Sequence, residues 1–225
     1  MQELIDADSL TLRKPQNVSK ILELWKVLFC LVSPSGKEVY YGAENQGETF
    51  LGAQVLKDLL PGKFYIVDPE GAELLLFKRS LNFLSHRLDV FDPEKNFLGY
   101  AEKTASLKGV SYQVRGVDQK ISFKIEGNIS DLSVFHILNG EGLKVGKISR
   151  KWSPPVEIQP GSPPVDAPIE PDRFGIIFPF GIDIVQKSLL LAVLFLIDFA
   201  SLEDERKAEK NKTKNAPHKG TSSKA

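Results

Sequence analysis

The chain of 225 residues lacks several features that would narrow its function at once. It has a single cysteine, Cys30, so no disulfide can form within the chain, which favours a reducing compartment. Lys and Arg together number 29, as do Asp and Glu, so the formal net charge is zero. Without a basic excess to neutralise phosphates, no nucleic-acid partner is expected. The acidic start, MQELIDADS, lacks the apolar segment of a secretory signal, and we expect a cytoplasmic protein.

Motifs for catalysis and for transition metals are scarce as well. The three histidines, His86, His136 and His218, do not share the spacing of zinc ligands with one another or with Cys30. The nucleophile elbow Gly-x-Ser-x-Gly is absent, and the glycine-containing stretch 140–147 does not match a phosphate-binding loop. The sequence therefore shows no hydrolytic or redox site, and we do not expect an enzyme.

Short apolar segments alternate with turn-forming residues through most of the chain. Turns are expected at residues 33–36, 68–71, 92–96 and 139–142, where Pro, Gly, Asp and Asn favour tight reversals. The segments around them predict hairpins, and the chain contains about a dozen strands in all. An antiparallel meander of this length closes to hide its edges, and a closed sheet of twelve strands has room inside for more than side chains. We therefore predict a mostly β protein built as a closed antiparallel barrel.

The longest apolar run, residues 189–197, lies within a segment predicted to be helical over residues 183–203. The 15 residues between Lys187 and Glu203 form a helix of roughly 22 Å, which is short for a hydrocarbon layer of about 30 Å. A helix that is apolar on all sides needs apolar cover on all sides. We predict that it fills the barrel, with Asp198 hydrogen-bonded inside; a single membrane span through 184–202 is the alternative. The residues expected in this core helix are Leu189, Leu190, Val193, Leu194, Ile197 and Asp198.

The chain divides into three parts by composition. Residues 1–20 are expected to be a loose leader, residues 21–203 the barrel domain, and residues 204–225 a disordered, lysine-rich tail. A loop at 153–171 holds seven of the 14 prolines and is expected to be extended. Such a loop could also bind a protein partner.

Several segments resemble the phospholipid scramblase family, which belongs to the wider group of tubby-like barrels. The resemblance covers roughly residues 23–203 and rests on the order and separation of these pieces: YYGAE at 40–44, FYIVD at 64–68, ELLLFKR at 73–79, VGKISRKW at 145–152, DRFGIIFP at 172–179 and FLIDF at 195–199. It implies a twelve-stranded barrel around a C-terminal helix. It also implies binding of membrane phospholipids at the cytosolic face and calcium-linked movement of phospholipids between leaflets.

The resemblance further implies a calcium-binding segment just before the helix. Glu170 and Asp172 match its first two acidic positions, whereas the third falls on Gly181; Asp183, two residues further on, is acidic. Because Ca²⁺ takes 6–8 oxygen ligands, this set predicts weak Ca²⁺ binding at most. The alternative is that these acids are simply solvated, and no other cofactor is expected.

Basic residues cluster near the last predicted hairpin. Lys144, Lys147, Arg150 and Lys151 lie on or beside one strand and could bind an anionic lipid headgroup, or could form a solvated barrel wall. The acylated cysteine cluster that is common in the family is absent, which disfavours a permanent lipid anchor. The prediction of a phospholipid-moving protein therefore has an alternative. The chain could be a soluble lipid-sensing module of the phosphoinositide-binding type, or a protein-interaction barrel without transport activity.

Overall fold

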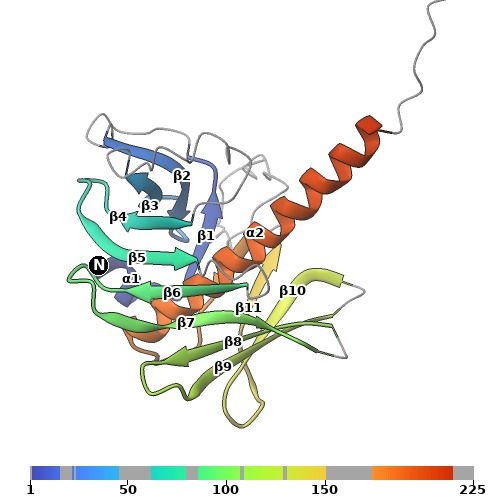
Figure 1. The fold of residues 1–225 in the computed structure, drawn as a ribbon. Helices are drawn as coiled ribbons and strands as arrows, with labels where there is room; N and C mark the ends of the chain where they lie inside the picture. Colours follow the sequence, from blue (N-terminus) through green and yellow to red (C-terminus); the bar gives the residue numbers. More distant parts are fainter. Residues whose placement is uncertain are drawn as a thin grey trace, which may run out of the picture.

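Twelve antiparallel strands close into one barrel in the computed structural model of the chain (Figure 1). The barrel order is β1-β12-β11-β10-β9-β8-β7-β6-β5-β4-β3-β2, so strands that follow one another from β2 to β12 are neighbours. The prediction of a closed antiparallel barrel is confirmed. The strands are β1 Ser9–Arg13, β2 Trp25–Val32, β3 Glu38–Asn45, β4 Lys63–Val67, β5 Glu73–Arg79, β6 Arg87–Phe91, β7 Phe97–Thr104, β8 Gly109–Gly116, β9 Ile121–Asn128, β10 Asp131–Leu138, β11 Lys144–Arg150 and β12 Phe174–Ile177.

The structure describes residues 2–15, 22, 24–45, 62–79, 86–106, 109–128, 131–150 and 174–214, with side chains up to residue 202 in the last range. The predicted proline-rich loop at 153–171 lies outside these residues, as does the end of the predicted tail from 215 onward.

Tight turns join each even-numbered strand from β2 to β10 to the next strand, so all of these turns lie at one end of the barrel, here called the turn end. A side-chain oxygen organises several of them, because it accepts the backbone N–H four residues later. Asp68 Oδ1 accepts from Ala72 N at 2.8 Å, and Asn139 Oδ1 accepts from Leu143 N at 2.9 Å. The turns predicted at 68–71 and 139–142 are therefore present, for the chemical reason expected.

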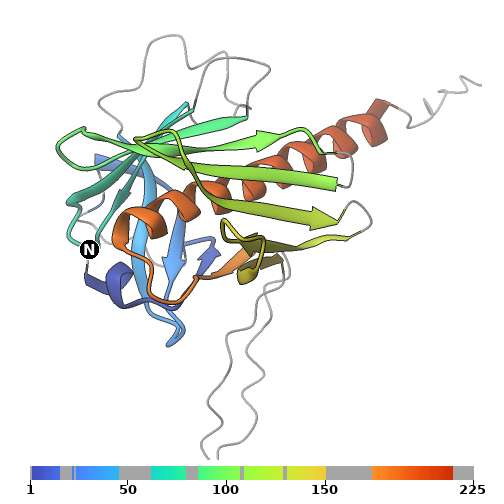
Figure 2. The same cartoon turned by 90° about the horizontal axis from the view of Figure 1, so that it is seen from below.

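Helix α2 (Ile184–Lys214) begins at the turn end, runs through the barrel and leaves it at the opposite end, here called the open end (Figures 1 and 2). Its residues from Leu189 to Ile197 are each at most 5% exposed. The ring of Phe195 lies 4.9 Å from that of Phe29, 5.3 Å from that of Phe64 and 5.2 Å from that of Phe77, measured between centroids. The prediction of a core helix is confirmed. The helix continues past residue 203 to Lys214, so the expectation of a disordered tail over residues 204–225 is wrong for residues 204–214.

Glycines in the barrel wall provide space for the aromatic rings around α2. Gly42 on β3 pairs with Phe29 on β2, and a Cβ atom at Gly42 would lie 2.0 Å from the ring of Phe29. Gly127 on β9 pairs with Phe135 on β10, and a Cβ atom there would lie 2.5 Å from that ring. Because each ring lies flat over a glycine, the wall accommodates bulky aromatic side chains and a helix at the same level.

The expectation of a loose leader over residues 1–20 is wrong for residues 2–13. Helix α1 (Gln2–Asp6) places Leu4 in the core at 1% exposure, and β1 closes the barrel by pairing with both β12 and β2. Leu10 of β1 lies opposite Ile176, which is more than 160 residues away in the chain. The barrel therefore begins at β1 rather than at residue 21. This strand was hard to predict, because five residues with so distant a partner show little periodicity.

The buried side chain of Lys187 attaches α1 to α2. Lys187 is 6% exposed, and its Nζ donates hydrogen bonds to the carbonyl oxygens of Leu4 (3.1 Å), Ile5 (2.6 Å) and Ala7 (2.7 Å). An ammonium has three donors, and here all three satisfy carbonyls at the end of α1, where the helical hydrogen-bond pattern stops. The Tyr40 hydroxyl accepts from Leu4 N at 3.0 Å, and burial raises the pKa of Tyr40 to about 12. Together these contacts close the turn end.

Replacing Lys187 by Met should destabilise the protein, because it removes the donors from three carbonyls at this end. Leaving one buried acceptor unsatisfied costs about 1–3 kcal/mol. We therefore expect the free energy of unfolding to fall by at least this amount. Urea denaturation measures it, and faster amide hydrogen exchange in residues 2–8 should accompany it. Lys37→Met is the control, since Lys37 is exposed and, among the described residues, forms an ion pair with Glu3 alone, at 3.3 Å. Equal stability of the two variants would contradict this role of Lys187.

Candidate functional site

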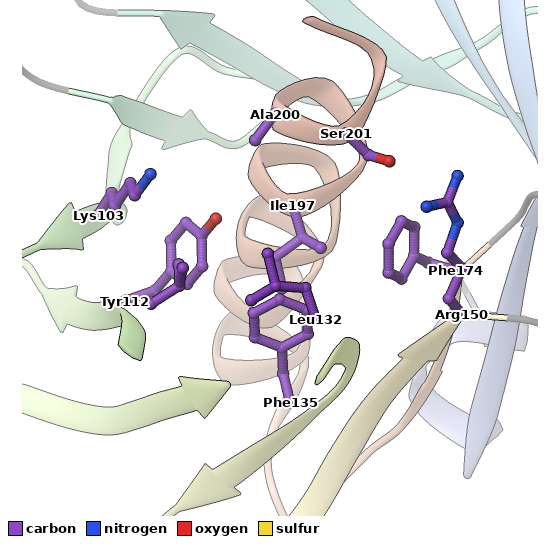
Figure 3. Close-up of a pocket in the computed structure, with 10 residues that line it drawn as sticks. Lys103, Tyr112, Leu132, Phe135, Arg150, Phe174, Ile197, Ala200 and Ser201 are labelled. Atoms are coloured by element: carbon purple, nitrogen blue, oxygen red, sulfur yellow. The ribbon is translucent and has the colours of Figure 1, made fainter. Parts of the chain in front are cut away.

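A cavity of about 320 Å³ lies at the open end of the barrel, beside the last buried turn of α2 (Figure 3). It is bounded by the open-end portions of β7, β8, β10, β11 and β12. Its lining is largely apolar, with two cationic side chains. The lining residues are Lys103, Val110, Tyr112, Leu132, Phe135, Arg150, Phe174, Ile197, Ala200 and Ser201.

Strand alternation directs both cations toward the inside of the barrel. Ala101 on β7 and Ile148 on β11 are core residues, and Lys103 and Arg150 follow them by two positions on the same face. The guanidinium carbon of Arg150 lies 5.8 Å from the centroid of the Phe174 ring. Lys103 makes no ion pair with any carboxylate in the described part of the chain. Both side chains therefore lie at the mouth of the cavity, above an apolar interior.

An irregularity between β9 and β10 helps to form the cavity. Asp131 pairs with Asn128, but the next pair along β9 is Gly127 with Phe135, so residues 132–134 have no register partner on β9. Leu132 lies in this bulge, is 45% exposed and reaches the cavity. Deeper in, the Tyr112 and Phe135 rings meet edge to face with centroids 6.2 Å apart. The bulge thus separates the start of β10 from the regular barrel wall.

The lining residues are mostly apolar. Besides the two cations, their polar side-chain groups are the hydroxyls of Tyr112 and Ser201, and the described lining has no carboxylate, histidine or cysteine. The volume falls at the lower end of the range of about 300–1,000 Å³ for small-molecule sites, which are mostly apolar with a few placed polar groups. This cavity has that character.

The predicted headgroup residues do not form one patch. Lys144 pairs with Leu138 beside the turn, Lys147 faces outward along the strand, and Arg150 pairs with Phe174 at the open end. At about 3.3 Å per residue, Lys144 and Arg150 are separated by roughly 20 Å of strand. Lys151 lies outside the described residues. Of the predicted set, the structure brings only Arg150 to the cavity.

Asp183, predicted as a calcium ligand, occupies the N-cap of α2. Its Oδ1 accepts from Gln186 N at 2.8 Å, and Gln186 Oε1 accepts from Asp183 N at 3.2 Å, which is the reciprocal pattern of a capping box. Glu170 and Asp172 lie outside the described residues, so the calcium prediction stays untested. Within the part that the structure describes, no group of three or more His, Cys, Asp or Glu side chains is placed to hold a metal ion.

Asp198 of α2 is buried, at 4% exposure, and takes part in an interaction with other residues. Its burial agrees with the predicted structural role. The hydrogen bond predicted for its carboxylate stays a prediction.

Sequence reasoning missed Lys103, Tyr112 and Leu132 as site residues. The alternation from Gly99 through Ala101 on β7 extends to Lys103 and is the signal that places it on the inner face.

The fold and the cavity define the class: a closed antiparallel barrel that buries its C-terminal helix and has a small cavity at one end. The sequence profile of the Scramblase family matches residues 25–204, and the chain belongs to this family. A crystal structure of a protein from Arabidopsis thaliana is similar at 15% identity and a TM-score of 0.46, over 84% of this chain and 91% of the other. Among curated proteins, none matches the chain at a significant level.

The capping box makes a test of Asp183 possible. Asp183→Ala should lower the free energy of unfolding by about 1 kcal/mol, because the N–H of Gln186 loses its acceptor at the start of α2. Asp183→Asn is the matched control, since the amide oxygen can still accept, and it should retain most of the stability. Thermal or urea denaturation measures both. If the Asn variant lost as much stability as the Ala variant, the carboxylate would have a role other than capping.

Proposed function

We propose that the protein binds phospholipid at the surface of a membrane, as a peripheral member of the scramblase family whose apolar helix stays inside the barrel. The burial of α2 is the observation that supports this. Residues Ile184–Leu202 are long and apolar enough to cross a membrane, yet 72% of this window is buried within the barrel. The fold therefore uses as its core the one helix, among the described residues, that is long and apolar enough to span a bilayer.

Insertion of α2 into a bilayer would leave the barrel without a core. The inward side chains of the wall, such as Phe29, Phe64 and Phe77, cover the helix and would lose their apolar neighbours. Burying one such side chain stabilises a protein by about 1.5–3 kcal/mol, so ten of them represent on the order of 15–30 kcal/mol. This exceeds the total stability of about 5–15 kcal/mol typical of a domain. Membrane contact through the outside of an intact barrel requires no such loss.

Family membership supports a second, finer function, which is calcium-linked movement of phospholipids between leaflets. Asp183 would offer Ca²⁺ one carboxylate, although its Oδ1 already accepts the N–H of Gln186. The remaining oxygens would have to come from elsewhere, with Glu170 and Asp172 as the candidates by family resemblance. Lipid binding by an intact barrel does not depend on this metal, so the two functions can be tested separately.

Flotation through a density gradient tests the proposed binding. The full chain should float with vesicles of mixed phosphatidylcholine and phosphatidylserine, and alkaline carbonate should release it, because no segment spans the bilayer. Vesicles of phosphatidylcholine alone are the control for charge, and each mixture is run with Ca²⁺ and with a chelator. A chain that stays at the bottom of every gradient would overturn the proposal and leave the protein-interaction barrel. Resistance to carbonate would show that α2 spans the membrane.

Lipid movement has its own assay, on the same vesicles. Dithionite bleaches only the outer half of a fluorescent phospholipid unless lipids exchange between leaflets. Because the helix stays within the barrel, we expect bleaching to stop near half of the label, with or without Ca²⁺. Bleaching well beyond half, with Ca²⁺ only, would establish the finer function instead.

A further inference from the structure

We infer that the turn end of the barrel is the surface that meets the membrane, with Phe180 and Leu143 inserted among the phospholipid headgroups. This inference rests on the proposed function, because it names the face through which an intact barrel contacts phospholipid. The turn end lies opposite the exit of α2 (Figure 2). Seven large apolar side chains are exposed in the described part of the chain, and five of them lie at this end: Ile5, Val117, Ile121, Leu143 and Phe180.

Phe180 is held in water by a turn whose two sides are both fixed. It is 101% exposed, so the described barrel covers none of its ring. Pro179 before it is buried, and Gly181 after it has a φ of 72°, a conformation that glycine adopts without strain. Asp183 then starts α2 through its capping box. A large apolar ring presented in this way is placed for contact with an apolar environment.

The neighbours of β12 place further apolar tips beside Phe180. Ile177 pairs with β11 on one side and with β1 on the other, so the chain that continues to Phe180 passes between the segments preceding those strands. These segments carry Leu143, which is 58% exposed, and Ile5, which is 48% exposed. Val117 lies on the next hairpin, β8–β9, so the tips follow one another over six strands, or roughly 24 Å of the rim. The turns after β2, β4 and β6, all of them described, carry no exposed large apolar side chain.

The chain itself offers no adjoining segment to cover these tips. Every strand connection at the turn end lies within the described residues. Apart from Met1, the residues outside that description belong to connections at the open end or follow α2. The surface that covers the tips is therefore sought outside the chain.

A lipid surface fits the tips better than a protein partner. A phenylalanine side chain presents about 150–250 Å², and each partly exposed aliphatic tip adds less. The total stays below the area of about 800 Å² that each partner contributes to a standard protein interface. The tips are also single side chains separated by charged turn residues, so a protein would need a separate pocket for each. A fluid headgroup layer surrounds each tip without a matching pocket.

The turns satisfy their own backbone groups, which lowers the cost of leaving water. Asn139 Oδ1 accepts from Glu141 N at 3.0 Å and from Leu143 N at 2.9 Å, while Asn139 O accepts from Gly142 N at 3.0 Å. Unsatisfied N–H groups at such a tip would oppose insertion.

The charges beside the tips are of both signs. The exposed cations are Lys120 and Lys144, and the exposed acids are Asp6, Asp118 and Glu141. Apolar contact therefore drives docking at this end. We expect binding to vesicles of phosphatidylcholine alone, with little loss at high salt.

Partitioning onto these vesicles locates the contact. Leu143→Ser at the turn end and Leu24→Ser at the open end make the same change at exposed leucines, 58% and 79% exposed. The partition coefficient of the full chain should fall about fivefold for Leu143→Ser and about tenfold or more for Phe180→Ser, and should not change for Leu24→Ser. Phe180→Trp, which keeps an aromatic ring suited to the headgroup layer, should bind as the wild type does. Because these side chains are exposed, urea denaturation should show unchanged stability.

Depth-dependent quenching gives a second readout. Phe180→Trp, combined with Trp25→Phe and Trp152→Phe, places the sole indole at the tip, and Leu24→Trp in the same background is the control. Phospholipids brominated close to the headgroup should quench the tip indole more than those brominated near the bilayer centre. The control indole should be quenched by neither.

Failure of this inference can be told apart from failure of the proposed function. If the wild type binds vesicles but either readout fails to distinguish the turn end from the open end, the inference is overturned and the proposed function stands. If the wild type stays at the bottom of every gradient, both fail. Self-association in sedimentation that Phe180→Ser abolishes, without vesicle binding, would show that the tips join two copies of the chain and would also overturn the inference.

Discussion

A helix without a polar face is the constraint on which the structure depends. From Leu189 to Ile197, α2 offers no side that tolerates water, so it needs apolar cover in every direction. A barrel of about eight strands has room only for its own side chains, whereas twelve strands leave room for a helix. The dependence is mutual, because the inward rings of Phe29, Phe64 and Phe77 all pack against Phe195 of α2. Barrel and helix are therefore stable together.

The two ends of the barrel differ, because one is closed by side-chain hydrogen bonds and the other has a cavity. At the turn end, α1, Lys187, Tyr40 and the capping box of Asp183 satisfy the exposed backbone groups and seal the core. At the open end, the bulge in β10 and the exit of α2 leave a cavity with inward-facing cations. The described barrel is therefore sealed at one end and has an apolar-lined cavity, with Lys103 and Arg150 among its lining residues, at the other.

Local chemistry made much of the fold predictable, and distant contacts account for the rest. The turns that begin at Asp68 and Asn139 follow from side chains four residues from their targets, and the core helix follows from an uninterrupted apolar run. The closing strand β1 was not predictable in this way, because its partner on one side is β12, near the other end of the chain. Lys187 marked one end of the apolar segment, but its bonds to carbonyls about 180 residues away appear only in the folded chain. The cavity likewise depends on a register shift that no local pattern specifies.

One fluorescence measurement can show whether α2 stays inside the barrel when the protein binds a membrane. Phe195→Trp, combined with Trp25→Phe and Trp152→Phe, places the sole indole in the middle of α2, among the aromatic rings of the wall. Vesicles containing phospholipids brominated along their acyl chains quench any indole that enters the bilayer. If α2 stays in the barrel, quenching remains at the level of a vesicle-free control while the protein is bound. Strong quenching by bromines near the centre of the bilayer would contradict it, because α2 would then have left the barrel.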